Sequence, residues 1–129
     1  MKNQSLNILL ADDESSIREV VQRILENLGH TVEATENGEQ AIAAFDRHPD
    51  SFQIVMTDHS MPKVNGLGLV SHLRSKNFQG KIIVMSGSLT EELSEEYKSK
   101  RVDKILVKPF AMKGLSVEMA DLLSDGGVV

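Results

Sequence analysis

Short apolar runs alternate with stretches of helical spacing along the chain, and this alternation restricts the possible folds more than any other feature of the sequence. Five runs are typical of buried strands, at residues 8–11, 30–35, 52–58, 81–87 and 103–110. The segments that follow them place apolar residues three and four positions apart, as on one face of a helix. Apolar strands joined by helical crossovers form parallel sheets with helices on both faces. The sequence therefore predicts an α/β fold with a five-stranded, doubly wound parallel sheet of (βα)5 organisation.

The first predicted helix has the clearest pattern, with apolar residues from Ile17 to Leu28 on one face. Ser16 and Glu19 match a capping box and predict the start of this helix, and Gly29 stands where a helix often stops. Three further helices are expected around residues 37–45, 67–73 and 115–123.

Residues 90–100 predict a weaker helix. Leu93 and Tyr97 are its apolar anchors, and its glutamates lie one turn apart, where like charges destabilise a helix. A marginal helix of this kind is a candidate moving part of the molecule.

Composition excludes several classes of function. The length favours one domain over residues 1–129, with its core at about 6–123 and a loose tail at 124–129. We expect a cytoplasmic protein without membrane insertion, because no apolar run approaches the roughly 18 residues of a membrane span and the start lacks a secretory signal pattern. Without cysteine, a metal site must use oxygen or histidine ligands. A net charge of -5 without a basic stripe argues against direct nucleic-acid binding.

Polar residues stand where the predicted strands end. Asp12 and Asp13 follow the first strand, Asp58 ends the third, Ser86 the fourth, and Lys108 lies at the end of the fifth. In doubly wound sheets, ligands bind at the carboxyl ends of the strands, near the point where the strand order reverses. We therefore expect these five side chains to meet at one edge of the sheet.

The chemistry of that edge favours a divalent cation. Three carboxylates against one lysine leave an excess of negative charge, and hard oxygen ligands without sulfur or nitrogen indicate Mg2+. A metal bound in this way keeps positions free for phosphate oxygens, and phosphoryl transfer needs mainly positioning and charge neutralisation. A carboxylate of the cluster could itself be the nucleophile. Taken alone, Asp12 and Asp13 would be read as acids at a helix start.

Four motifs, each ending a predicted strand, together resemble the receiver domain of bacterial-type response regulators, in the CheY-like superfamily. They are ADDE at 11–14, MTDHSMPKVNG at 56–66, VMSG at 84–87 and LVKPF at 106–110. The resemblance covers about residues 6–123 and implies a flavodoxin-like strand order of 2-1-3-4-5. It also implies a role in a two-component or phosphorelay system.

The resemblance implies that Asp58 accepts a phosphoryl group from a histidine kinase or a histidine phosphotransfer protein. Mg2+ would be held by Asp12, Asp13 and Asp58 together with the main-chain carbonyl of Ser60. The modified domain would then alter its binding to an output partner or pass the phosphoryl group onward. The chain would not be an enzyme beyond its own Mg2+-dependent phosphorylation and autodephosphorylation.

The remaining residues of the implied site act on the attached phosphoryl group. Lys108 would pair with it, Ser86 would swing to hydrogen-bond it, and the small Gly87 would leave it room. The Lys108–Pro109 bond would be cis, which the modest cost of a cis bond before proline permits.

The sequence departs from the family at two positions. Ile105 stands where the family usually has an aromatic residue, and Arg101 where it often has glycine. Since isoleucine has no polar end, our hypothesis is that Ile105 stays in place on phosphorylation. The signal would instead be read out through Ser86, the loop at 87–92 and the weak helix. His59, beside the phosphoacceptor, is interpreted as a partly exposed loop residue rather than a second acceptor or a metal ligand.

Alternative functions remain open at this stage. The chain could be the receiver fragment of a hybrid histidine kinase or of a larger regulator, although the last helix lacks an arginine used by the winged-helix transcription-factor branch. A phosphohydrolase of the haloacid-dehalogenase type also uses an aspartyl nucleophile, but it needs DxDx[ST] after the first strand, where this chain has DDES. A third alternative is a receiver that is no longer phosphorylated and serves as a docking surface.

Overall fold

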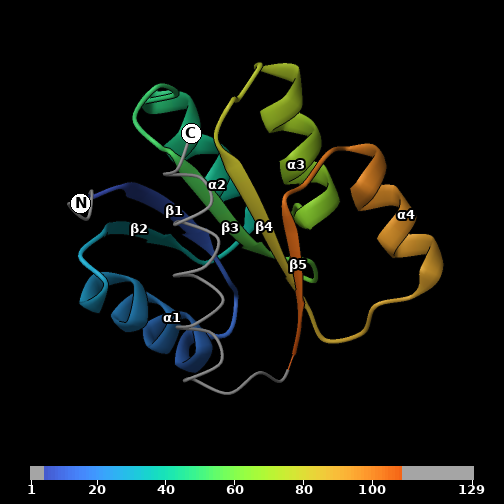
Figure 1. Cartoon of the computed structure of the whole chain (residues 1–129), viewed down its shortest axis with the longest axis horizontal. Helices are drawn as coiled ribbons and strands as arrows, with labels where there is room; N and C mark the ends of the chain where they lie inside the picture. The colour runs from blue at the N-terminus through green and yellow to red at the C-terminus, as the bar shows by residue number, and fades with distance from the viewer. Residues whose placement is uncertain (1–4, 109–129) are drawn as a thin grey trace.

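A computed structural model describes residues 5–108, in which five parallel strands form one sheet (Figure 1). The strands are β1 (Asn7–Ala11), β2 (Thr31–Thr35), β3 (Ile54–Asp58), β4 (Lys81–Ser86) and β5 (Lys104–Val107). Their order across the sheet is β2-β1-β3-β4-β5, so the predicted order is confirmed. The helix expected around 115–123, the tail at 124–129 and the cis bond to Pro109 lie outside the described residues.

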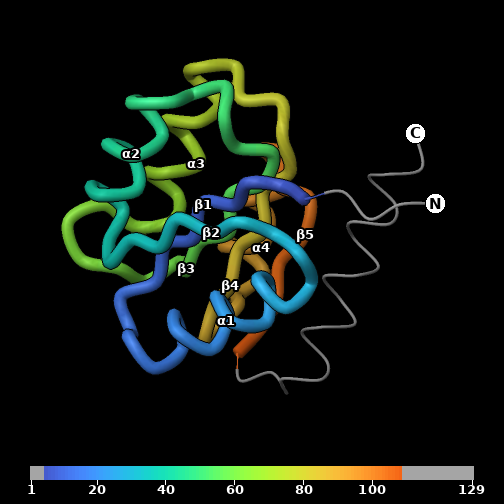
Figure 2. Tube along the Cα trace, turned by 90° about the vertical axis from the view of Figure 1, so that its left-hand side faces the viewer, coloured from blue at the N-terminus to red at the C-terminus, as the bar shows by residue number. Residues whose placement is uncertain are grey.

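Four helices alternate with these strands and cover both faces of the sheet. They are α1 (Ser15–Asn27), α2 (Gly38–Arg47), α3 (Gly66–Ser75) and α4 (Glu91–Ser99). Figure 2 shows α1 on one side of the strands and α2 with α3 on the other. Within residues 5–108, no helix combines the length and apolar character needed to cross a membrane.

The two faces of the sheet belong to two hydrophobic clusters, as alternating side chains require. On strand β1, Ile8 and Leu10 pack with helix α1, whereas Leu9 packs in the cluster that includes α2 and α3. All three of these side chains are fully buried. Burial on both sides explains why the strands are continuous apolar runs, and it fixes the strand ends that carry the polar residues.

Helix α1 begins earlier than the sequence predicts. Its first residue is Ser15, and its N-cap Glu14 makes no side-chain capping bond, so the capping box at Ser16 and Glu19 is wrong. The physical reason lies upstream, because Asp12 Oδ1 accepts a hydrogen bond from the Glu14 N–H and turns the chain into the helix before Ser16. At the other end the prediction is confirmed, since Gly29 has a φ of 99° and follows the helix in the left-handed conformation.

Helix α4 forms as predicted and is attached to the core mainly by one side chain. Thr90 caps it by accepting a hydrogen bond from the Leu93 N–H at 3.0 Å. Tyr97 is its only buried residue. Arg101 follows the helix with a φ of 61°, a left-handed conformation that favours glycine.

Candidate functional site

The strand register brings the predicted acidic residues together. Strand β1 pairs with β3 so that Ala11 faces Thr57, and Asp12 and Asp58 each follow one of these partners. Asp12, Asp13 and Asp58 each offer a carboxylate oxygen, and these three oxygens lie within 4.8 Å of one another. Asp12 and Asp58 are buried, and Asp13 is exposed. The edge of the sheet therefore carries a compact acidic cluster that solvent reaches from one side.

Lys108, the residue directly after strand β5, reaches this cluster. Its Nζ lies 3.2 Å from Asp58 Oδ2 and 3.6 Å from Asp12 Oδ2. The Lys108 N–H donates a hydrogen bond of 2.7 Å to the Ser86 carbonyl, which fixes the lysine beside the end of β4. The lysine side chain is largely buried, so its charge acts on both carboxylates with little screening.

Asp12 is the most deeply buried acid of the cluster. It is fully buried, and its Oδ1 accepts the Glu14 N–H at 3.0 Å. Among residues 5–108, Oδ2 finds no hydrogen-bond partner, because Lys108 Nζ at 3.6 Å is too far away. The oxygen is left with an ion-pair contact that is too long for a hydrogen bond and that Lys108 shares with Asp58, and a buried oxygen without a hydrogen bond is destabilising. A cation at this oxygen would relieve that cost.

Burial also raises the pKa of both buried carboxyl groups. For Asp12, burial is the largest effect, and the Glu14 N–H and Lys108 lower the pKa by a smaller amount. For Asp58, burial again dominates, Lys108 opposes it, and the charge of Asp12 adds to it. One lysine therefore does not compensate the acids, and an oxygen donor set with excess negative charge fits a hard divalent cation such as Mg2+.

Ser86 and Gly87 lie at the end of β4, but Ser86 is turned toward its own loop. Its hydroxyl donates a hydrogen bond of 2.7 Å to the Ser88 carbonyl and accepts one from the Ser88 N–H at 3.3 Å. Among residues 5–108, leaving aside its two chain neighbours, no atom lies within 4 Å of a Cβ placed on Gly87, so this part of the chain leaves the space beside Gly87 open. The structure thus places both residues near the site without bringing the Ser86 hydroxyl onto a carboxylate.

The other two predicted residues lie on the loop after β3 and on strand β5. Ser60 is exposed on the loop between β3 and α3, two residues after Asp58. Ile105 is half-buried on β5 and packs against the hydrophobic cluster beneath α2 and α3.

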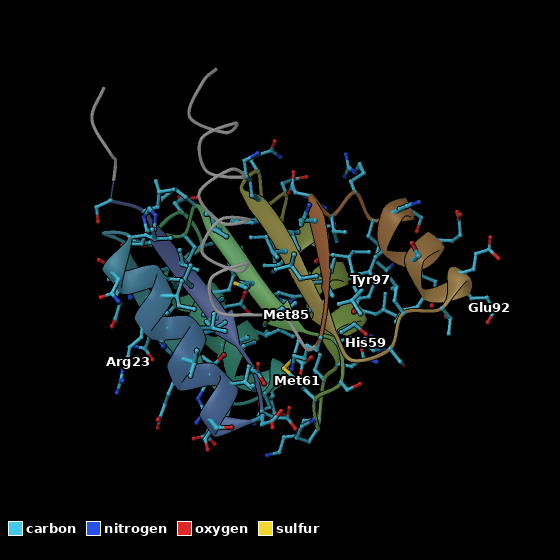
Figure 3. All side chains as sticks on the ribbon, turned by 60° about the horizontal axis from the view of Figure 1, so that its bottom comes forward. Arg23, His59, Met61, Met85, Glu92 and Tyr97 are labelled. Carbon is cyan, nitrogen blue, oxygen red and sulfur yellow. The ribbon has the colours of Figure 1, made fainter. Side chains whose placement is uncertain are left out.

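Sequence reasoning missed one contact next to the phosphoacceptor candidate. His59 is half-buried, as expected for a partly exposed loop residue, but its Nδ1 lies 2.6 Å from the Tyr97 hydroxyl oxygen. Figure 3 shows the two side chains facing each other from the loop after β3 and from α4. No spacing rule joins residues 38 positions apart in a loop and a helix, so the sequence carries no signal for this pair.

A doubly wound parallel sheet with an acidic cluster and a lysine at its carboxyl edge defines the class of this protein. The model of the response regulator receiver domain family matches residues 8–120. The chain therefore belongs to this family and is a receiver domain of two-component signalling.

Similar proteins agree with this assignment. The probable transcriptional regulator ycf27 of Pyropia yezoensis is 33% identical over 125 residues, which cover 95% of this chain and 49% of the relative. The chain thus spans about half the length of this curated relative. The chemotaxis protein CheY4 of Vibrio cholerae is 26% identical with a TM-score of 0.82, and the match covers 92% of this chain and 98% of CheY4. CheY in the CheX-CheY-BeF3-Mg+2 complex of Borrelia burgdorferi has the same fold, with a TM-score of 0.83 at 23% identity over 92% of this chain and 89% of that one.

Proposed function

We propose that Asp58 is the phosphoacceptor of this receiver domain. The observation that supports this most directly is the position of its carboxylate at the end of β3, 3.2 Å from Lys108 Nζ and within 4.8 Å of oxygens of Asp12 and Asp13. A carboxylate oxygen of Asp58 attacks the phosphorus atom of the donor. The bond between phosphorus and the donor breaks, and its electron pair leaves with the donor.

Mg2+ would be held by Asp12, Asp13, Asp58 and the Ser60 carbonyl, and it would neutralise charge on the phosphoryl oxygens. The cation is supported by the excess of acids and by Asp12 Oδ2, which makes no hydrogen bond within residues 5–108. Lys108, already between Asp12 and Asp58, pairs with the phosphoryl group. Ser86 exchanges its hydrogen bond to Ser88 for one to the phosphoryl group, which draws the loop after β4 inward.

The experiment uses acetyl phosphate, Mg2+ and the whole chain. Mass spectrometry should detect one added phosphoryl group, and borohydride trapping followed by peptide mapping should place it on Asp58. Asp58→Asn should abolish the label, while Asp50→Asn, which changes an exposed acid in the turn before β3, should keep it. A label at another residue would refute the assignment of Asp58, and labelling that is unaffected by EDTA would refute the Mg2+ requirement.

The same proposal covers the partners and the setting of the domain. A histidine kinase or histidine phosphotransfer protein supplies the phosphoryl group in the cytoplasm, and an output protein of unknown identity reads the modified surface. Since the chain spans about half of the ycf27 relative, the receiver could equally be part of a larger regulator or of a hybrid kinase. The mass of the native gene product would distinguish these cases.

We also propose that the domain has no catalytic turnover on a separate substrate. A phosphohydrolase would release phosphate repeatedly from a generic phosphomonoester, whereas this domain should accept one phosphoryl group per chain and then hydrolyse its own acyl phosphate. Steady-state phosphate release from such a substrate would contradict this proposal. Failure of every phosphodonor, despite an intact Mg2+ site, would favour a docking role.

A further inference from the structure

Residue His59, directly after the proposed phosphoacceptor, is joined to helix α4. Its Nδ1 lies 2.6 Å from the Tyr97 hydroxyl oxygen, and the two rings meet edge to face with centroids 5.6 Å apart (Figure 3). Tyr97 is fully buried. A buried tyrosine hydroxyl needs a hydrogen-bond partner, and His59 supplies it.

The backbone N–H and the carbonyl of His59 both form hydrogen bonds. Its N–H donates to the Met85 carbonyl at 2.8 Å, and its carbonyl accepts from the Gly66 N–H at 2.8 Å. A Cβ at Gly66 would collide with the Tyr97 hydroxyl and would lie 2.9 Å from the Asp58 carbonyl oxygen. The Tyr97 hydroxyl, the Asp58 main chain and the first residue of α3 are therefore packed against one another without spare room.

Tyr97 also anchors helix α4 to the hydrophobic core. It is the only buried residue of that helix, and Leu93 is only partly buried. Burial raises the pKa of Tyr97, and the charge of Asp58 raises it further, so the hydroxyl keeps its proton and lies within the electrostatic range of the phosphoacceptor. Ile105 has no hydroxyl and cannot make an equivalent hydrogen bond.

We infer that the hydrogen bond between His59 and Tyr97 couples the chemical state of Asp58 to the position of helix α4. This inference rests on the proposed function of Asp58. Asp58, His59 and Ser60 are consecutive, so any rearrangement that draws Asp58 and the Ser60 carbonyl toward a metal and a phosphoryl group also displaces the His59 ring against Tyr97. The coupling is reciprocal, and a partner that binds α4 changes the affinity of the site by the same factor.

The test uses beryllofluoride with Mg2+, which mimics the phosphoryl group, on the whole chain. Tyr97 is the only tyrosine and the chain has no tryptophan, so intrinsic fluorescence reports on this residue alone. In the wild type, beryllofluoride should change Tyr97 emission and the amide hydrogen exchange of residues 91–99. Tyr97→Phe keeps the ring but removes the hydroxyl. This variant should still bind beryllofluoride, with an affinity changed about two- to tenfold, and it should lose most of the change in amide hydrogen exchange at residues 91–99.

Two substitutions of His59 separate coupling from simple loss of packing. His59→Ala should behave as Tyr97→Phe does, whereas His59→Asn keeps an amide group near the position of Nδ1 and should restore most of the response. Glu92→Gln, on the exposed face of α4, is the matched control and should respond as the wild type does (Figure 3). Because His59 is only half-buried, the comparison of His59→Ala with His59→Asn tests the coupling even if Tyr97→Phe lowers the stability of the domain.

The inference is overturned where His59→Ala binds beryllofluoride with wild-type affinity and shows the wild-type exchange response of α4. It is also overturned where His59→Asn and His59→Ala lose the response equally. A wild-type chain that binds no beryllofluoride would instead refute the proposed function. The two failures are therefore distinguishable.

Discussion

Replacing Asp12 by asparagine should stabilise the metal-free domain and remove most of the stabilisation that Mg2+ provides. Asp12 is fully buried, and its Oδ2 has no hydrogen-bond partner within residues 5–108. Asparagine keeps an oxygen to accept the Glu14 N–H and replaces the charged oxygen by a neutral amide group. Because the buried charge of Asp12 lies beside two other carboxylates and shares Lys108 with Asp58, we expect the free energy of unfolding in EDTA to rise by about 1–2 kcal/mol when that charge is removed.

Mg2+ should reverse the relative stability of Asp12→Asn and the wild type. A ligand that binds only the folded state, present at 100 times its Kd, stabilises it by about 2.7 kcal/mol. The wild type should gain about this amount in Mg2+, and Asp12→Asn only a small fraction because one ligand is lost. The variant should therefore be more stable than the wild type in EDTA and less stable in Mg2+.

Urea unfolding followed by circular dichroism, with and without Mg2+, measures both differences. Asp50→Asn is the control, because it removes the same charge from an exposed position and should leave the response to Mg2+ unchanged. If Asp12→Asn is less stable than the wild type in EDTA, the buried charge of Asp12 does not destabilise the metal-free domain. An Mg2+ response equal to that of the wild type would refute the metal site.

Three further predictions concern residues outside the acidic cluster. Burial lowers the pKa of His30 from 6.5, so the free energy of unfolding should fall as the pH drops below about 6.5. His30→Asn can still accept the Leu6 N–H, and in urea unfolding it should lose less stability at low pH than the wild type does. Identical pH profiles of the two proteins would contradict this. Arg101→Gly should raise the free energy of unfolding by about 0.5–1 kcal/mol, because its φ of 61° strains an L residue; a loss of stability would argue against strain. Crystal structures with and without beryllofluoride should show Ile105 in one place beside a displaced Ser86 loop, since exposing it would lose up to roughly 2 kcal/mol; a flipped Ile105 would refute this.

The sheet and the members of its acidic edge could be predicted because they depend on repeated, local signals. Buried parallel strands are continuous apolar runs, and the rule that their carboxyl ends meet at one edge places Asp12, Asp58 and Lys108 together without any knowledge of side-chain geometry. The structure adds what such rules omit. It shows that Asp12 Oδ2 lacks a hydrogen-bond partner within residues 5–108, and that Ser86 is engaged with Ser88.

The start of α1 could not be predicted because two local signals compete there. Ser16 and Glu19 have the residue types of a capping box, but Asp12 Oδ1 accepts the Glu14 N–H first and the helix begins at Ser15. A side chain at the end of a strand thus decided the boundary of the next helix. This also joins α1 to the acidic site, since the Arg18 guanidinium donates to the Asp12 carbonyl at 2.8 Å.

The buried sheet and the weakly attached helix α4 differ in how strongly they resist movement, as the proposed switch requires. The strands that lead to Asp12 and Asp58 are buried on both faces, so the body of the sheet resists movement when the charge at its edge changes, and the loops that follow the strands take up the change. Tyr97 is the only buried residue of helix α4, and several of its glutamates lie one turn apart, where their like charges weaken the helix. A change of charge at Asp58 is therefore expressed where the fewest buried contacts resist it. The contact of His59 with Tyr97 joins the fixed part to the movable one, and for this reason its hydrogen bond, rather than the side chain of Ile105, is the place to test how the signal leaves the site.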